Sequence, residues 1–231
     1  MNVLALDTTL GACSAAIARG DPQAPEVTGV YELRDRAHAE SIVPMIESVL
    51  ANASLGYDEL DAIAVTTGPG SFTGVRVGVS VARGLALATG LPLISVTSLE
   101  VMARMALDTL EQTPDALGVA VDARRGEVYI GIYDGVGGVL SEPKALTPEQ
   151  AHALLPGGGR IVLAGGGADL VREVAGKRRI FNTILPELQP DAHMLVRIAM
   201  TRAPTQGPVH PLYLRPPDAK PQTGKALSRQ S

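Results

Sequence analysis

The sequence predicts an α/β protein built from two related halves. Short apolar runs typical of buried strands alternate with segments whose apolar residues recur at helical spacing. Hydrophobic residues make up 45% of the 231 residues but aromatics only 3%, without tryptophan, so the core must consist of Val, Leu, Ile and Ala. An apolar run that ends in an aspartate occurs twice, at residues 4–7 and 119–122, which indicates an internal duplication.

The first half contains five predicted strands, each a short apolar run bounded by glycine, proline or polar residues. They cover residues 3–7, 13–18, 27–33, 61–66 and 93–96. A helix is expected over residues 38–53, where apolar residues recur at helical spacing. Because proline is tolerated only in the first turn, Pro44 places the start of the regular helix near Ser41. Another helix is predicted to start at Ser98.

The stretch 68–89 combines a glycine-rich loop with a helix, and it lacks the lysine of a phosphate-binding P-loop. Two rows of small residues recur at spacing four: Gly74, Gly78 and Ala82, and Ser80, Gly84 and Ala88. Each interior glycine costs about 1 kcal/mol of helix stability relative to alanine, which close packing against another backbone would offset. Two interpretations stay open: a tightly buried helix with a solvated edge of Arg76, Ser80 and Arg83, or a helix that presents a flat face to another subunit.

The second half repeats the opening of the first. Strands are predicted at residues 119–122, 128–133 and 161–164. Residues 147–150 form a capping box with proline at the first helical position, which predicts the start of a helix. A helix is expected after the glycines at 165–167, and another after Asp191. From residue 203 onward prolines recur and the periodicity ends, so residues 215–231 are expected to form a mobile tail.

Composition and charge argue against several functional classes. A net charge of −4 disfavours stand-alone nucleic-acid binding, which needs clustered Lys and Arg. The single cysteine, Cys13, excludes an internal disulfide and indicates a reducing compartment. Asp7 interrupts the N-terminal apolar run, which argues against a signal peptide, and no run reaches the roughly 18 apolar residues of a membrane span. We therefore expect a cytoplasmic location and no membrane contact.

Two aspartates are candidate ligands for a metal ion or for nucleotide phosphates. Asp7 and Asp122 each end a predicted strand, where α/β sheets place ligands, although either could instead cap its own turn. For Asp122 the capping interpretation is favoured. The glycines at 165–167 would allow close approach of a purine or of another strand, with a structural turn favoured. The histidines form no HxxxH or HExxH pair, and His38 is the most eligible of them for a functional role.

Six segments together resemble the TsaB family, formerly called YeaZ. They are ALDTT at 5–9, the helix start at 38–44, GPGSFTGVR at 68–76, TSLE at 97–100, VDARRGEVY at 121–129 and PLYLR at 211–215. This family comprises bacterial subunits needed for the threonylcarbamoyl modification of adenosine 37 in tRNAs that read ANN codons. The resemblance implies an actin-like ATPase fold with two RNase H-like lobes, at residues 1–100 and 101–214. It also implies that the last helix packs back on the first lobe.

The resemblance also implies partners. TsaB-like proteins bind the catalytic subunit TsaD, the ATPase TsaE joins that pair, and tRNA is contacted only through the complex. The expected contact uses the helices at 38–53 and 74–89, and the same helices would form a homodimer. The implied interface residues are His38, Ile42, Met45, Ile46, Gly74, Arg76, Gly78, Ser80 and Arg83.

Two departures from the catalytic relatives bear on activity. TsaD binds metal through an HxxxH pair, whereas residues 98–110 contain no histidine, so the resemblance implies neither a catalytic residue nor a metal site in this chain. Residues 123–125 are Ala-Arg-Arg where an actin-like ATPase has a glycine-containing phosphate turn. No cofactor is therefore expected in this chain, and ATP or ADP only at the level of the complex. The weak nucleotide-binding candidates are Asp7, Thr8, Thr9, Asp122, Gly165 and Gly166.

These observations favour a non-catalytic scaffold that activates TsaD. The alternative is an autonomous actin-like ATPase or phosphotransferase that uses the turn after Asp7. A peptidase is a distant third, because neither a metal site nor a nucleophile constellation is visible in the sequence.

Overall fold

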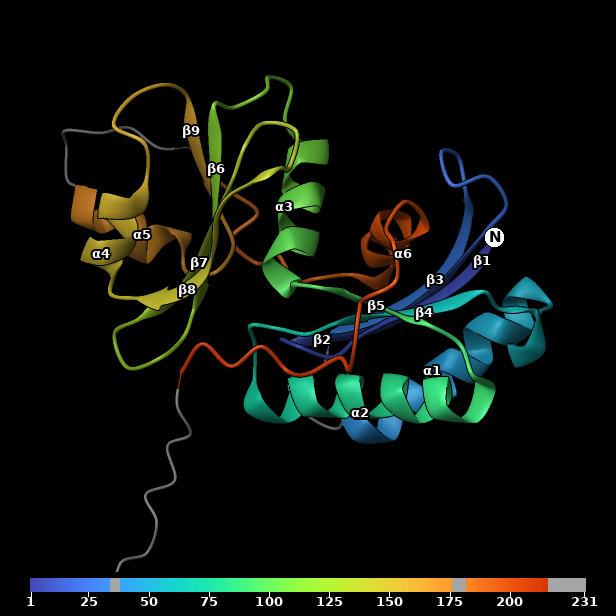
Figure 1. The fold of residues 1–231 in the computed structure, drawn as a ribbon. Coiled ribbons are helices and arrows are strands. Elements are labelled where there is room, and N and C mark those ends of the chain that lie inside the picture. Colours follow the sequence, from blue (N-terminus) through green and yellow to red (C-terminus); the bar gives the residue numbers. More distant parts are fainter. Residues whose placement is uncertain (34–37, 176–181, 216–231) are drawn as a thin grey trace, which may run out of the picture.

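A computed structural model describes residues 1–33, 38–175 and 182–215, which form two five-stranded mixed sheets with helices packed on them (Figure 1). The first sheet has the order β3-β2-β1-β4-β5. Its strands are β1 Asn2–Asp7, β2 Ala12–Arg19, β3 Glu26–Leu33, β4 Ala62–Thr66 and β5 Leu93–Val96. Since β1 is antiparallel to β2 and parallel to β4, it forms the centre of a mixed sheet.

The second sheet repeats this arrangement. Its order is β8-β7-β6-β9-β10, with β6 antiparallel to β7 and parallel to β9. Its strands are β6 Ala116–Asp122, β7 Val128–Tyr133, β8 Val139–Leu146, β9 Ile161–Ala164 and β10 Asn182–Ile184. The two aspartates of the sequence repeat, Asp7 and Asp122, end the equivalent strands β1 and β6. The predicted fold class, an actin-like α/β fold of two RNase H-like lobes, is confirmed.

Helices cover both faces of the first sheet. The helices of the two lobes are α1 His38–Ala53, α2 Phe72–Thr89, α3 Ser98–Asp108, α4 Pro148–Leu154, α5 Ala168–Ala175 and α6 Ala192–Met200, and a 3-10 turn spans Tyr57–Glu59. The helices α1 and α2 pack on one face of the first sheet through Ile42, Ile46 and Val79 (Figure 1). The last helix, α6, packs on the opposite face, where Leu195 and Ala199 are fully buried.

The helix α3 joins the two lobes. Its residue Val101 belongs to the core of the first sheet, whereas Leu99 and Met102 pack against β6 and β7 of the second sheet. The other face of the second sheet is covered by α4 and α5 (Figure 1). At the start of α3, Glu100 forms an ion pair with Arg202, which follows α6. The lobes are therefore held together by a shared helix rather than by a loose linker.

Three features differ from the prediction. The helix α1 begins at His38, not near Ser41, so that Pro44 lies inside it. Pro44 has no amide hydrogen to donate to the carbonyl of Glu40. Both residues lie on the exposed side of α1, so water can hydrogen-bond to this carbonyl instead. The strands β8 and β10 were not predicted: β8 is a largely exposed edge strand, and β10 has three residues. In the described part of the chain, no helix is both long and apolar enough to cross a membrane.

Candidate functional site

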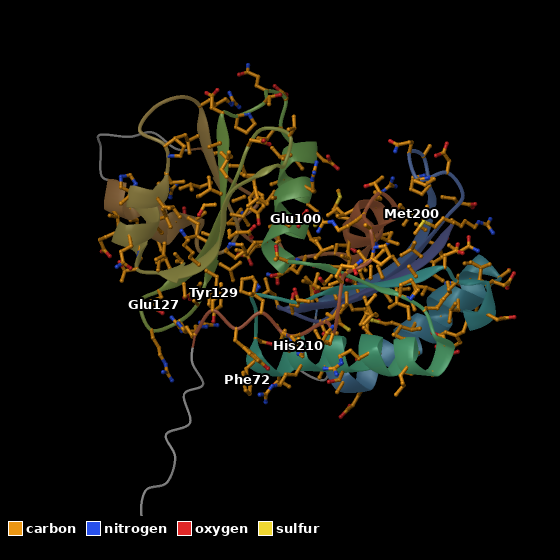
Figure 2. All side chains as sticks on the ribbon, in the orientation of Figure 1. Phe72, Glu100, Glu127, Tyr129, Met200 and His210 are labelled. Carbon is orange, nitrogen blue, oxygen red and sulfur yellow. The ribbon has the colours of Figure 1, made fainter. Side chains whose placement is uncertain are left out.

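A cavity of about 930 Å³ lies between the two lobes. The first lobe lines it with the β1–β2 turn and the start of α2, and the second with the β6–β7 turn and Tyr129. Phe72 of α2 and Tyr129 of β7 come from opposite sides of this cleft (Figure 2). The C-terminal segment, residues 212–215, also lines it. The candidate nucleotide ligands Asp7 and Asp122 end the strands β1 and β6, directly before the two turns that line this cavity.

Asp7 is fully buried and does not line the cavity. Its carboxylate accepts hydrogen bonds from the Thr9 amide at 3.2 Å, the Thr9 hydroxyl at 2.8 Å and the Thr66 hydroxyl. The buried Thr8 hydroxyl donates to the Gly74 carbonyl of α2 at 2.7 Å. The three candidates Asp7, Thr8 and Thr9 thus bond within the protein and join the turn to β4 and α2.

The β1–β2 turn also has internal partners for its backbone. Turns of this kind can hold a phosphate through their amides. The Gly11 amide, however, donates to the side-chain oxygen of Gln189 at 2.9 Å, and the Thr9 carbonyl accepts from the Ser71 amide at 2.7 Å. A methyl group on Gly70 would lie 2.2 Å from the Thr9 carbonyl oxygen, so α2 begins in direct contact with the turn. Gln189 therefore occupies an amide that a phosphate could otherwise use.

Asp122 caps its own turn. One carboxylate oxygen accepts from the Arg124 amide at 2.7 Å, and the other lies 3.7 Å from the Arg124 guanidinium. Arg124 and Arg125 have φ angles of 64° and 57°, in the left-handed region that bulky residues seldom adopt. These two residues place two arginine side chains at the mouth of the cavity.

The glycines at 165–167 allow close approach of another strand. A methyl group on Gly165 would lie 2.4 Å from the Ala120 carbonyl of β6, and one on Gly167 would lie 2.8 Å from the Val121 carbonyl carbon. Gly166 alone of the three lines the cavity. The close approach of Gly165 to β6 therefore accounts for a glycine at this position without a bound purine.

The C-terminal segment after α6 ties the two lobes together across the cleft. On the first lobe the Thr205 amide donates to the Leu93 carbonyl at 2.8 Å, and the Leu212 amide donates to the Thr67 carbonyl at 2.7 Å. On the second lobe Arg215 donates to the Ala123 carbonyl at 2.8 Å and forms an ion pair with Glu127. We call residues 205–215 the strap.

The strap and the start of α2 form an aromatic and cationic cluster at the rim of the cavity. The Arg76 guanidinium lies 3.6 Å from the centroid of the Phe72 ring, and its Nε donates to the Tyr213 hydroxyl at 2.7 Å. The rings of Phe72 and Tyr213 are 5.6 Å apart, and both residues are about half exposed. We call these three residues the Phe72 cluster.

Several residues implied as a partner interface lie in the core. Ile42, Met45 and Ile46 are at most 6% exposed and pack between α1 and the first sheet. Methyl groups on Gly74 and Gly78 would lie 2.0 and 2.6 Å from atoms of Thr8, so these glycines face the β1–β2 turn. These five positions are buried and unavailable to a partner in this conformation. The small-residue row that contains Gly74 and Gly78 is thus the buried face of the helix.

The exposed face of α2 carries the second row of small residues. Arg76, Ser80 and Arg83 are exposed, as the sequence indicated, and a methyl group on Gly84 would meet nothing within 4 Å. Leu87 on this helix is 88% exposed. The neighbouring helix α1 adds Val43, 48% exposed. We call Arg76, Ser80, Arg83, Gly84 and Leu87 of α2, together with Val43 of α1, the helix face. The side chain of the interface candidate His38 lies outside the described residues.

Sequence reasoning did not single out Gln189, Phe72, Tyr213 or Arg215 as site residues. Gln189 carries no local signal, because its partner Gly11 is 178 positions away. Phe72, Tyr213 and Arg215 do lie in the quoted segments GPGSFTGVR and PLYLR. Within the described ranges, no group of three or more His, Cys, Asp or Glu side chains is arranged to hold a metal ion.

Two lobes of the same strand order, facing each other across a cleft, define a protein of the actin-like ATPase class. A family model described as TsaD, tRNA N6-adenosine threonylcarbamoyltransferase, matches residues 23–167. The solved structure of YeaZ from Pseudomonas aeruginosa is similar, with 33% identity and a TM-score of 0.75 over 86% of this chain and 90% of that chain. The chain belongs to the TsaB (YeaZ) family.

Two curated relatives are tRNA threonylcarbamoyladenosine biosynthesis proteins named TsaB. The Haemophilus influenzae protein is 46% identical over 130 residues, 56% of this chain and 52% of its own. The Escherichia coli protein is 37% identical over 156 residues, 66% of this chain and 65% of its own. The chain thus matches between half and two thirds of the length of these relatives.

Proposed function

We propose that this chain is a non-catalytic scaffold subunit in the biosynthesis of threonylcarbamoyladenosine at position 37 of tRNAs that read ANN codons. In this proposal it acts by binding and activating a TsaD-type catalytic subunit. Its relatives named TsaB support the pathway. The observation that carries the scaffold role is the hydrogen bond from the Gly11 amide to Gln189, which occupies the turn of an actin-like nucleotide site.

The environment of Asp7 also favours a non-catalytic role for this chain. A carboxylate that orients a metal ion or a water needs to reach the cleft, whereas Asp7 is fully buried and accepts hydrogen bonds from two threonines. Arg124 and Arg125 stand where the phosphate turn of the second lobe would need a glycine. The strap also joins the lobes at both ends, and this opposes the cleft opening that nucleotide exchange requires.

The helix face is the surface we propose for the TsaD-type partner. Small residues such as Ser80 and Gly84 allow another helix to approach closely, and Leu87 leaves a large apolar side chain in water. Arg76 and Arg83 flank this row and could pair with acidic residues of the partner. The proposed contact thus uses Arg76, Ser80 and Arg83, and excludes the five buried positions of α1 and α2.

The proposal extends to the other partners. A TsaE-type ATPase would join the pair, tRNA would be reached through the complex, and the assembly would be cytoplasmic. Two copies of this chain would use the same helix face in a homodimer, so partner binding and self-association would compete. An excess of the TsaD-type subunit should then convert the homodimer into the heterocomplex.

The alternative function is an autonomous actin-like ATPase or phosphotransferase. The cavity volume of about 930 Å³ favours it, because it falls within the range of small-molecule sites. Calorimetric titration of the isolated chain with ATP and Mg²⁺ decides between the two. The scaffold proposal expects no heat of binding at millimolar ATP, and saturable binding with turnover would establish the alternative.

The scaffold proposal is tested by light scattering of the chain mixed with its cognate TsaD-type subunit. Ser80→Arg places a bulky charge on the helix face and should abolish a 1:1 complex. Ala153→Arg makes the same kind of change at an exposed position of α4 on the second lobe and should leave the complex intact. Gly78→Leu is unsuitable, since it would disrupt the contact with Thr8. Equal binding by both variants would remove the helix face from the interface.

A further inference from the structure

The walls of the interlobe cavity are cationic although the chain as a whole is acidic. Among the described residues that line the cavity, four are arginines, Arg76, Arg124, Arg125 and Arg215, and one, Asp122, is an acid. The whole chain has a net charge of −4. A concave surface with one sign of charge concentrates ligands of the opposite sign. The cavity is therefore suited to an anionic ligand.

The four arginines have different roles. Arg215 is engaged by Glu127 and by the carbonyls of Ala123 and Arg124, so it holds the β6–β7 turn in place. Arg124 is 87% exposed at its side chain, and Arg125 is also exposed. Arginine guanidinium groups match the geometry of phosphate oxygens. The turn thus places two exposed arginine side chains beside the cavity, and the Arg124 guanidinium lies 3.7 Å from the Asp122 carboxylate.

The Phe72 cluster adds flat aromatic surface to this charge. Phe72 and Tyr213 are 50% and 48% exposed, so each ring leaves aromatic surface accessible beside the cavity. Arg76 lies against the Phe72 ring and fixes it beside the cavity mouth. Exposed aromatic rings next to arginines are typical of surfaces on which the bases of single-stranded nucleic acid stack.

We propose that the cavity and the Phe72 cluster bind a single-stranded segment of RNA, with phosphates at Arg124 and Arg125 and a base on Phe72. This inference rests on the proposed function, because tRNA is the RNA that the complex would carry. It adds a direct contact between this chain and the tRNA within the complex. RNA is favoured over an acidic peptide because a peptide carboxylate would use the arginines but leave the two exposed rings without a role.

The site can be tested on the isolated full-length chain by fluorescence anisotropy with a labelled 12-nucleotide single-stranded RNA. Asparagine tolerates the left-handed backbone that Arg124 and Arg125 adopt, so Arg124→Asn with Arg125→Asn removes two charges without adding strain. Loss of two phosphate contacts should weaken binding about 25-fold at 0.1 M salt and reduce the salt slope by about 1.4. Arg172→Asn, an exposed arginine of α5, is the matched control and should change neither quantity.

The aromatic part is tested with Phe72→Leu, which keeps an apolar side chain but removes the ring. We expect RNA affinity to fall about 10-fold with an unchanged salt slope, because stacking does not neutralise phosphate. A polyglutamate peptide is the competing probe. If it displaces the RNA and binds equally well to Phe72→Leu, the ligand class is an acidic peptide and the RNA proposal is overturned. RNA binding that is the same in wild type, in the double variant and in the control also overturns it.

The same variants, assembled with the cognate TsaD-type subunit, separate this inference from the proposed function. If wild type forms the complex and the double variant forms it equally but binds unmodified tRNA more weakly, both proposals stand. If no complex forms while the isolated chain still binds RNA through Arg124 and Arg125, the scaffold proposal fails and the RNA site survives. If the complex forms and binds tRNA with the same affinity whether it contains wild type or the double variant, the RNA site is refuted and the scaffold proposal stands.

Discussion

Two alanine substitutions on one helix test the account of how α2 packs. At Gly74 a methyl group would lie 2.0 Å from the Thr8 carbonyl oxygen and 2.6 Å from the Ser71 hydroxyl. At Gly84 it would meet nothing within 4 Å. Replacing glycine with alanine gains helix propensity, at most about 1 kcal/mol, at either position. The main difference between the two variants is therefore the space around the new methyl group.

The geometry sets the size of the effect. An ordinary contact needs about 3.4 Å, so Gly74→Ala must move α2 away from the β1–β2 turn by more than an ångström, because neither the new methyl group nor the Thr8 carbonyl can rotate away. Overpacking of this kind costs about 3 kcal/mol, at the upper end of the usual range. After the gain in propensity, Gly74→Ala should be destabilised by about 2 kcal/mol, and Gly84→Ala stabilised by about 1 kcal/mol.

Thermal unfolding followed by circular dichroism measures both variants. For a chain of this size, 1 kcal/mol shifts Tm by about 2–4 °C. Gly74→Ala should therefore lower Tm by about 4–8 °C, whereas Gly84→Ala should raise it by about 2–4 °C. If Gly74→Ala melted at or above the wild-type temperature, the close contact between α2 and Thr8 would not exist in solution. Equal destabilisation of both variants would mean that Gly84 is also buried.

Three further changes probe other contacts. Glu100→Gln weakens the partly buried pair with Arg202, and urea unfolding should show a loss of about 1 kcal/mol. The Asp191 carboxylate raises the pKa of His193 through a hydrogen bond to the ring. The pair therefore stabilises the fold below the ordinary histidine pKa of about 6.5, and this stabilisation is lost as pH rises through the raised pKa. The fall in Tm between pH 6 and pH 8 should be smaller in His193→Gln than in the wild type. Arg215→Gln releases the strap from the second lobe, so limited thermolysin digestion should cut within residues 205–215 several-fold faster, and an unchanged rate would contradict the anchoring role.

The regular elements were predictable because each depends on local pattern. The strands β5, β7 and β9 have the predicted bounds, and the capping box of Thr147 and Gln150 starts α4 as expected. The strand β8 has no hydrophobic alternation, and Pro143 is its only buried residue, so its pairing with β7 depends on tertiary contacts. Propensity alone could not identify it.

The candidate site was harder to predict because it depends on long-range partners. Residue type made Asp7 a reasonable ligand, but its carboxylate accepts from Thr66, 59 positions away. The exposed residues of α1 and α2 were hard to predict for a different reason. The apolar stripe of Ile42, Met45 and Ile46 that predicted α1 is buried in the core of the first lobe, and this stripe does not by itself identify which residues the helix exposes.

The most direct test of the scaffold account is reconstitution of the tRNA modification with the cognate TsaD-type and TsaE-type proteins. Threonylcarbamoyladenosine formed on an ANN-reading tRNA would be measured with and without this chain. The account predicts no product from this chain alone, a large gain when the wild type is added to the partners, and no gain with Ser80→Arg, while Ala153→Arg behaves as wild type. Product formed without a TsaD-type subunit, or equal product with and without this chain, would contradict the account.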